Sequence, residues 1–233
     1  MRPAGRRNGR RSAALAMTMF VWLAGCSPSP HDNAPAPSPA KVGYQMPAGI
    51  HYVDHWVSTP AVDLMSADGT FIRAFAEADD VRIFNIDGKK GSYPGFVGAD
   101  RTNQRAGGGG GEWFGYAIRW ITEFQVLPDG SAIAQVCSLH SITPDGSIHE
   151  GLLNETLKYQ RVGASPPADQ HGPARAPGVS VFGDWQATEY SARVPITKES
   201  LEPCEQTTPA IDKNNVNTAP GWPVAGSTGT SPG

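Results

Sequence analysis

The feature that most constrains the fold is a pair of identical turn sequences set between apolar segments. Pro-Asp-Gly-Ser occurs at 128–131 and again at 144–147, sixteen residues later. Pro supplies the fixed φ of a turn's first central position, and Gly supplies the left-handed conformation that follows. The apolar segments around these turns, at 116–126, 132–142 and 148–159, therefore predict a three-stranded antiparallel meander.

The first apolar segment alternates between apolar and polar residues. Its even positions are Tyr116, Ile118, Trp120, Thr122, Phe124 and Val126, and its odd positions include Arg119, Glu123 and Gln125. Successive side chains of a strand point to opposite faces, so we expect the even positions to face the core. Tyr116, Trp120 and Phe124 would then line a concave inner face.

One helix is predicted before the meander. Phe71, Phe75 and Ala78 recur at helical spacing, and either Asp68 or Thr70 can cap the first turn. Five glycines at 107–111 are expected to form a flexible loop between helix and meander, and 184–190 a fourth strand. A helix packed on a curved antiparallel sheet gives the fold class α+β.

The first 25 residues have the layout of an export signal. Five arginines and no acidic residue precede an apolar stretch from Ala13 to Leu23, and the segment ends at Cys26. A charged start, an apolar centre and small residues before the cleavage point are typical of such signals. The apolar stretch is about a dozen residues long, whereas a helix needs roughly 20 to span a bilayer. It is therefore not expected to remain as a membrane span.

The tetrapeptide Leu23-Ala24-Gly25-Cys26 closely resembles the lipobox of bacterial lipoproteins. The resemblance implies removal of residues 1–25, a thioether-linked diacylglycerol on Cys26, and acylation of the new amino terminus with a fatty acid such as palmitate. Several acyl chains anchor stably because each buried CH₂ contributes about 0.8 kcal/mol. The implied location is the extracytoplasmic face of the cell membrane. Arg10-Arg11 also resembles a twin-arginine signal, so both Sec and Tat export stay open.

Loss of the leader makes the chain more acidic. The whole chain carries 19 basic and 22 acidic residues, and removal of five arginines leaves 14 against 22, a formal charge of −8. An acidic exterior repels phosphate backbones, so we expect no nucleic-acid partner.

Two cysteines, Cys137 and Cys204, remain once Cys26 carries lipid. Disulfides persist outside the cytoplasm, so we expect these two to pair; two unpaired buried thiols are the alternative. If 128–130 is a three-residue loop, Cys137 lies opposite Ile121 on the outward face that carries Arg119. A C-terminal segment crossing that face could then reach it.

Composition predicts the domain boundaries. Residues 26–41 are a Pro-rich tether, which at about 3 Å per residue would hold a domain some 40–45 Å from the membrane. Residues 205–233 are rich in Thr, Pro, Asn and Gly and are expected to be a disordered tail. The segment 42–204 is then a single α+β domain.

Two broader resemblances rest on the element order. The helix at 71–78, the strands at 116–126 and 136–142, and Gly-Asp-Trp at 183–185 are loosely similar to cone-shaped NTF2-like domains. The Arg-rich leader, Pro-rich tether and acidic domain resemble uncharacterised lipoproteins of actinobacteria such as mycobacteria. This second resemblance implies an envelope location and no particular activity.

His140 and Glu150 are the low-ranked catalytic candidates. If both Pro-Asp-Gly turns are three-residue loops, Ile118 faces His140 and His140 faces Glu150 on the inner face. A His beside a carboxylate can act as an acid/base couple or anchor a ligand. The alternative is a structural ion pair at a sheet edge, and a one-residue register slip separates the two groups.

Other motifs give no chemistry. His51 and His55 have the four-residue spacing of a helical metal site, but on a strand they lie about 13 Å apart. Ser38 and Lys41 match a Ser-x-x-Lys spacing inside the Pro-rich tether, where no helix brings the two side chains together. We therefore expect no metal site and no cofactor.

Three functions remain open. The first is a non-catalytic envelope lipoprotein that binds a small apolar ligand against Tyr116, Trp120 and Phe124, or docks onto an envelope protein. The second is a hydrolase or isomerase that uses His140 and Glu150. The third is a surface-exclusion lipoprotein of the prophage type, which rests on the lipoprotein format alone.

Overall fold

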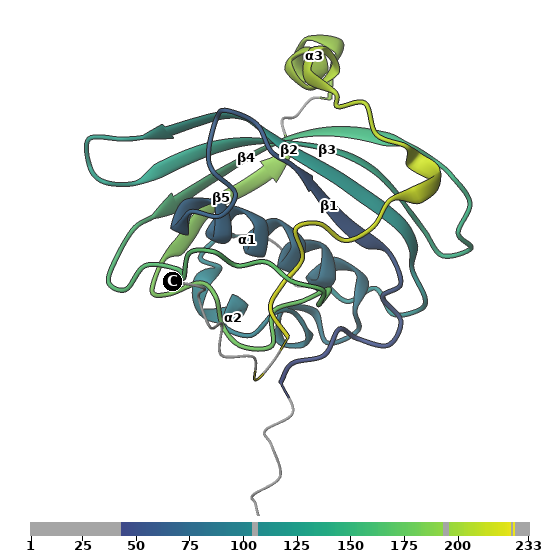
Figure 1. The fold of residues 1–233 in the computed structure, drawn as a ribbon, viewed down its shortest axis with the longest axis horizontal. Helices are drawn as coiled ribbons and strands as arrows, with labels where there is room; N and C mark the ends of the chain where they lie inside the picture. Colours follow the sequence, from purple (N-terminus) through teal and green to yellow (C-terminus); the bar gives the residue numbers. More distant parts are fainter. Residues whose placement is uncertain (1–42, 104–106, 193–195, 225, 227–233) are drawn as a thin grey trace, which may run out of the picture. The chain divides into compact units, whose positions relative to one another are not determined.

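A five-stranded sheet forms the centre of the computed structural model, which describes residues 43–103, 107–192, 196–224 and 226 (Figure 1). The strands follow one another across the sheet in chain order, from β1 to β5. Their bounds are Val53–Val57 for β1, Phe114–Val126 for β2, Ala132–Thr143 for β3, Gly151–Gln160 for β4 and Gln186–Ala192 for β5. With its helices the sheet makes an α+β fold, as expected.

The antiparallel meander of β2, β3 and β4 is confirmed, and β5 joins it as the fourth antiparallel strand. Gly130 and Gly146 have φ of 82° and 74°, the left-handed conformation that the repeated turn sequence requires. In each turn the Asp carboxylate accepts hydrogen bonds from the Ser two residues later, which lowers the pKa of Asp129 and of Asp145. The local sequence thus determines both turns.

β1 was not predicted, and it makes the sheet mixed, because it pairs in parallel with β2. The chain reaches β2 from β1 through a helical crossover, the connection that a parallel pair requires. The sequence does not predict β1 because its five residues, Val-Asp-His-Trp-Val, include a buried Asp and form no long apolar pattern.

The crossover begins with α1, Ala67–Phe84, followed by the 3-10 helix η1, Gly88–Gly91, and the short α2, Phe96–Ala99. Ser66 caps α1 and accepts a hydrogen bond from Gly69 N at 3.0 Å, so the predicted caps were wrong. Asp68 instead accepts from Tyr159, and Thr70 is buried. Phe71, Phe75 and Ala78 are buried as expected, but α1 also buries charged residues, which are Arg73, Glu77, Asp79 and Arg82.

Helices lie on both faces of the sheet. Figure 1 shows α1 and α2 on one face and α3, Lys198–Thr207, on the other. The main core lies between α1 and the sheet, whereas Trp120, Cys137 and Cys204 form a smaller cluster beneath α3. We call these the α1 face and the α3 face.

The prediction that all even positions of β2 face one core was wrong. A bulge shifts the register between Ile121 and Glu123, so the side-chain alternation reverses within the strand. Trp120 therefore packs on the α3 face, whereas Ile121 and Phe124 pack on the α1 face. Arg119, expected outside, is 2% exposed.

The pentaglycine segment packs closely against the end of α1. Gly109 N donates to Ile83 O at 3.0 Å, and a Cβ on Gly107 would collide with the carbonyl of Arg82. These glycines permit a close backbone approach, which differs from the flexible loop expected.

Residues 205–224 do not form a disordered tail. They include the end of α3, the 3-10 helix η2, Lys213–Asn215, and Trp222, which is 0% exposed within the main core. The domain therefore extends beyond residue 204. The predicted signal (1–25), the tether (26–41) with Cys26, and Ser38 and Lys41 lie outside the described residues.

Candidate functional site

A buried charge network lies between α1 and the sheet. Arg119 of β2 contacts Asp54 of β1 and Asp80 of α1 through its two terminal nitrogens. Asp54 is 4% exposed, and burial raises its pKa, although the Arg119 guanidinium opposes that shift. Burial also raises the pKa of Glu155 on β4 to about 7. Charged side chains of β1, β2 and β4 therefore interact with α1 in the interior.

Glu77 of α1 is the acceptor for three aromatic donors. Its carboxylate accepts hydrogen bonds from Trp56 Nε1 at 2.8 Å, Tyr93 OH at 2.8 Å and Trp222 Nε1 at 2.7 Å. Burial raises the pKa of Glu77, and the Arg73 charge and the hydrogen bonds from Trp222 and Tyr93 oppose this shift. The Arg73 guanidinium lies 4.5 Å from the centre of the Trp222 ring.

Both groups are closed to solvent, so a substrate could reach them only if the domain opened. Arg73, Glu77, Asp54 and Arg119 are all almost fully covered. Buried charges persist when partners and hydrogen bonds compensate for the lost solvation. We interpret this network as the device that fixes α1 on the sheet. Sequence analysis missed it because Arg119 was assigned to the outer face.

The structure does not bring His140 and Glu150 together. His140 pairs with Ala117 and Gly151, whereas the prediction paired it with Ile118 and Glu150. The predicted register was wrong in the first hairpin because of the bulge between Ile121 and Glu123. In the second it was wrong because the connection from Thr143 of β3 to Gly151 of β4 is longer than three residues.

Each of the two catalytic candidates has a separate environment. Burial lowers the pKa of His140, which belongs to the α1 face because it alternates in step with Val136. Glu150 instead accepts hydrogen bonds from Tyr116 OH at 2.6 Å and Lys213 Nζ at 2.7 Å, which lower its pKa. The acid/base couple expected from the sequence is therefore not formed.

The three proposed pocket residues do not share a concave face. Tyr116 donates to Glu150, and Trp120 Nε1 donates to Thr207 Oγ1 at 2.8 Å beneath α3. Phe124 lies beyond the bulge, packs against the main core, and has the Arg161 guanidinium 5.7 Å from its ring centre. The ligand surface expected from these residues is thus divided between two faces.

The disulfide between Cys137 and Cys204 is confirmed, with 5.5 Å between the Cα atoms. Both residues are fully buried. Its predicted surroundings were wrong, because Cys137 lies opposite Trp120 and α3 covers the bond. The disulfide pins α3 to the centre of the sheet.

A surface pocket of about 250 Å³ lies beside the end of α1. Its lining includes Pro47, Ile50, Phe84, Ile86 and the last two glycines of the pentaglycine segment. Ile86 is 78% exposed, and Ile83, three residues earlier in the chain, is 40% exposed. The sequence signals that could have revealed this pocket are the two glycine-containing segments at 47–49 and 107–111.

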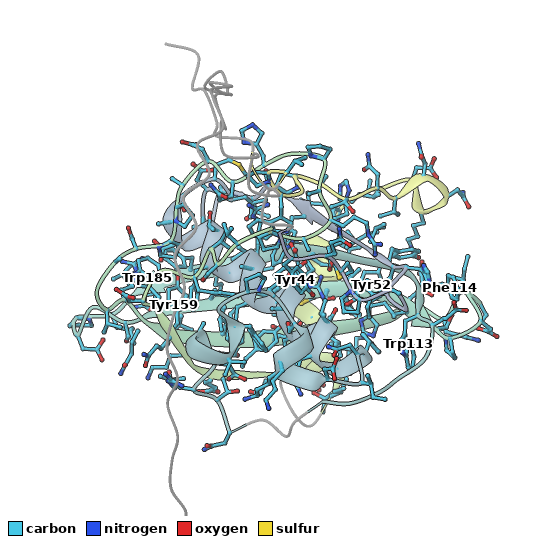
Figure 2. All side chains as sticks on the ribbon, turned by 90° about the horizontal axis from the view of Figure 1, so that it is seen from below. Tyr44, Tyr52, Trp113, Phe114, Tyr159 and Trp185 are labelled. Carbon is cyan, nitrogen blue, oxygen red and sulfur yellow. A yellow bond between two sulfur atoms is a disulfide. The ribbon has the colours of Figure 1, made fainter. Side chains whose placement is uncertain are left out.

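Aromatic residues support the pocket from the sheet side. The rings of Phe84 and Trp113 lie 4.7 Å apart, and Tyr52 meets Phe84 edge-on at 5.7 Å. Figure 2 shows Trp113 and Phe114 at one end of the domain and Tyr159 and Trp185 at the other. The pocket therefore belongs to the Trp113 end.

The two histidines at metal-like spacing have other partners. The His51 ring stacks on Phe114 at 4.6 Å, and His55 Nδ1 lies 2.9 Å from Asn217 O. Within the described ranges, no group of three or more His, Cys, Asp or Glu side chains is arranged to hold a metal ion.

Among the helices of the described residues, none combines the length and hydrophobicity needed to cross a membrane. Comparison with known proteins gives no further identification: no protein family, curated protein or solved structure matches the chain.

Proposed function

We propose that the chain is a lipid-anchored, extracytoplasmic lipoprotein whose domain docks onto an envelope protein and catalyses no reaction. The anchor follows from the lipobox resemblance at Cys26. The Cys137–Cys204 disulfide supports an oxidising compartment.

The observation that carries the docking proposal is the pocket lined by Ile50, Phe84 and Ile86. Small-molecule sites usually enclose about 300–1,000 Å³, and this pocket of about 250 Å³ lies just below that range. It suits a single anchoring side chain of a partner, such as Leu or Phe. Ile86 lines the pocket, and Ile83, three residues earlier in the chain, is also exposed. Large exposed apolar side chains grouped in this way favour a protein contact.

We also propose a distant relationship to NTF2-like domains. The support is the arrangement of one long helix, α1, across one face of a mostly antiparallel sheet. The relationship would concern the fold alone, since the same fold can carry unrelated functions.

Site-specific photo-crosslinking in the intact envelope tests the docking proposal. We would replace Ile86 with a benzophenone amino acid and irradiate cells that produce the full precursor. The matched control carries the same residue at Val126, which is 46% exposed and lies at the far end of β2 from the pocket. A discrete adduct at position 86, absent at position 126, is the expected result.

A second variant links the adduct to the pocket. With the crosslinker at Ile83, the additional substitution Ile86→Asp should abolish the adduct, because a carboxylate would be desolvated at the contact. Equal adduct patterns at positions 83, 86 and 126, or none at position 86, would reject this surface as the docking site.

A further inference from the structure

The C-terminal segment fills a site built on the α1 face, away from the surface pocket. Its Trp222 ring meets the Tyr93 ring edge-on at 6.2 Å and lies against the Arg73 guanidinium. The Trp222 Nε1–H donates a hydrogen bond to Glu77, which is 2% exposed. The Trp222 indole therefore contacts an aromatic ring, a guanidinium and a buried carboxylate at once.

Hydrogen bonds to neighbouring segments hold the backbone at Ala219 and at Trp222, and between these positions the chain bends at Pro220, with Gly221 in the left-handed conformation at φ of 67°. Trp222 and Ala174 exchange two hydrogen bonds, of 2.9 and 3.0 Å, and Gly172 N donates to Pro220 O at 3.1 Å. Ala219 bonds to β1 through Trp56 N and Asp54 O. The bonds of Ala219 to β1 are of the kind by which a peptide adds to the free edge of a sheet.

We propose that these contacts form a separable recognition site for a peptide segment that carries a tryptophan, and that the chain's own residues 217–224 occupy it reversibly. The site selects an indole ring because the indole N–H donates the hydrogen bond that Glu77 accepts. Phe lacks the N–H that Glu77 accepts, and a buried acceptor left unpaired is unfavourable.

Separability follows from how the segment is attached. Cys204 is fixed covalently on the α3 face, whereas Trp222 is held on the α1 face by non-covalent contacts alone. Residues 205–217 between them are mostly exposed, and Figure 1 shows this yellow segment passing from α3 to the α1 side. Withdrawal of Trp222 would therefore leave α3 and the disulfide in place.

Release would open a site with polar and aromatic walls. Arg73, Glu77 and Tyr93 would then face the vacated space, and a partner's tryptophan could take the position of Trp222. This site and the Ile86 pocket differ in chemistry, so the inference does not depend on the proposed docking surface.

A peptide-exchange experiment tests the proposal. Residues 210–215, most of which are exposed, are replaced by the recognition sequence of a specific protease, and the purified, disulfide-intact chain is cleaved there. A fluorescent synthetic peptide of residues 216–226 is then added, and its anisotropy is measured. We expect saturable binding as the labelled peptide exchanges with the cleaved segment.

Two variant peptides decide specificity while the folded body stays unchanged. Trp222→Ala should weaken binding by about 30-fold or more, the effect of losing an interface hot spot. Asn217→Ala is the matched control, because Asn217 is exposed and only its backbone oxygen has a described contact. It should bind like the parent peptide.

Each other outcome overturns the proposal. If the cleaved segment never exchanges, the site is not separable. If it leaves and the labelled peptide does not bind, the site recognises nothing by itself. Equal binding of the Trp222→Ala peptide would remove the role assigned to the indole.

Discussion

Arg119 illustrates how a single residue can be misassigned by strand alternation alone. Its odd position in β2 predicted exposure, yet it lies between Asp54 and Asp80 in the interior. Charge type indicates an outer position only when no carboxylates are available inside, and those of β1 and α1 come from distant parts of the sequence. Local pattern therefore could not identify this network.

Arg119→Met should destabilise the domain by about 3–5 kcal/mol, the range for breaking a buried ion pair and leaving its partners uncompensated. Denaturant melts of the soluble domain measure the loss. Adding Asp54→Asn and Asp80→Asn to Arg119→Met should recover part of the lost stability, because the two unpaired carboxylates are then removed. A loss below about 1 kcal/mol in the single variant would mean that the network contributes little to stability.

Glu155 should make stability depend on pH. Its pKa in the folded domain is about 7, above the ordinary value of 4.5. The folded state therefore binds this proton more tightly, and the stability that it contributes falls as pH rises from about 4.5 to about 7. At about 1.4 kcal/mol per pKa unit the effect is at most about 3 kcal/mol, and less because Glu155 is only half-buried.

The check is a series of melts of wild type and Glu155→Gln between pH 5 and pH 8. The variant should be the more stable at pH 8 and should show a flatter pH dependence. His140, whose pKa is lowered by burial, acts in the opposite sense as pH falls below its ordinary value of 6.5. Parallel curves for the two proteins would contradict the role of Glu155.

At the scale of elements, the meander was predictable because its information is local. The two Pro-Asp-Gly-Ser turns and the apolar segments around them determine three strands without help from the rest of the chain. The bulge after Ile121, the parallel strand β1 and the helix α3 depend on tertiary contacts. Among the candidate site residues, the cysteine pair could be predicted because only two cysteines remain beyond Cys26, which leaves a single possible pairing.

Removal of the disulfide should release α3 while the α1 face stays packed. In the Cys137→Ala, Cys204→Ala double variant we expect a loss of about 2–5 kcal/mol, typical of a native disulfide. Hydrogen exchange should become faster at the amides of α3, Lys198–Thr207, and remain slow in α1. Equal acceleration in both helices would show that the two faces of the sheet are not independently stabilised.

At the scale of the whole molecule, the two faces of the sheet are stabilised by different interactions. The α3 face is held by a covalent bond and the α1 face by buried charge and aromatic packing. The C-terminal segment connects the two, from Cys204 to Trp222. Composition predicted disorder there because the segment has few apolar residues, but one tryptophan with a complementary site is sufficient to place it.

Our central proposal is that lipid on Cys26 anchors this domain to the outer face of a membrane. The direct measurement is fractionation of cells that produce the wild-type precursor or Cys26→Ala, with a high-salt wash and immunodetection of the domain. We predict that the wild-type protein stays with the membranes after the wash and that the variant does not, because the proposed anchor is the lipid and the variant has no cysteine at position 26 to carry it. Membrane retention of Cys26→Ala after the wash, or release of the wild type by salt, would contradict the account.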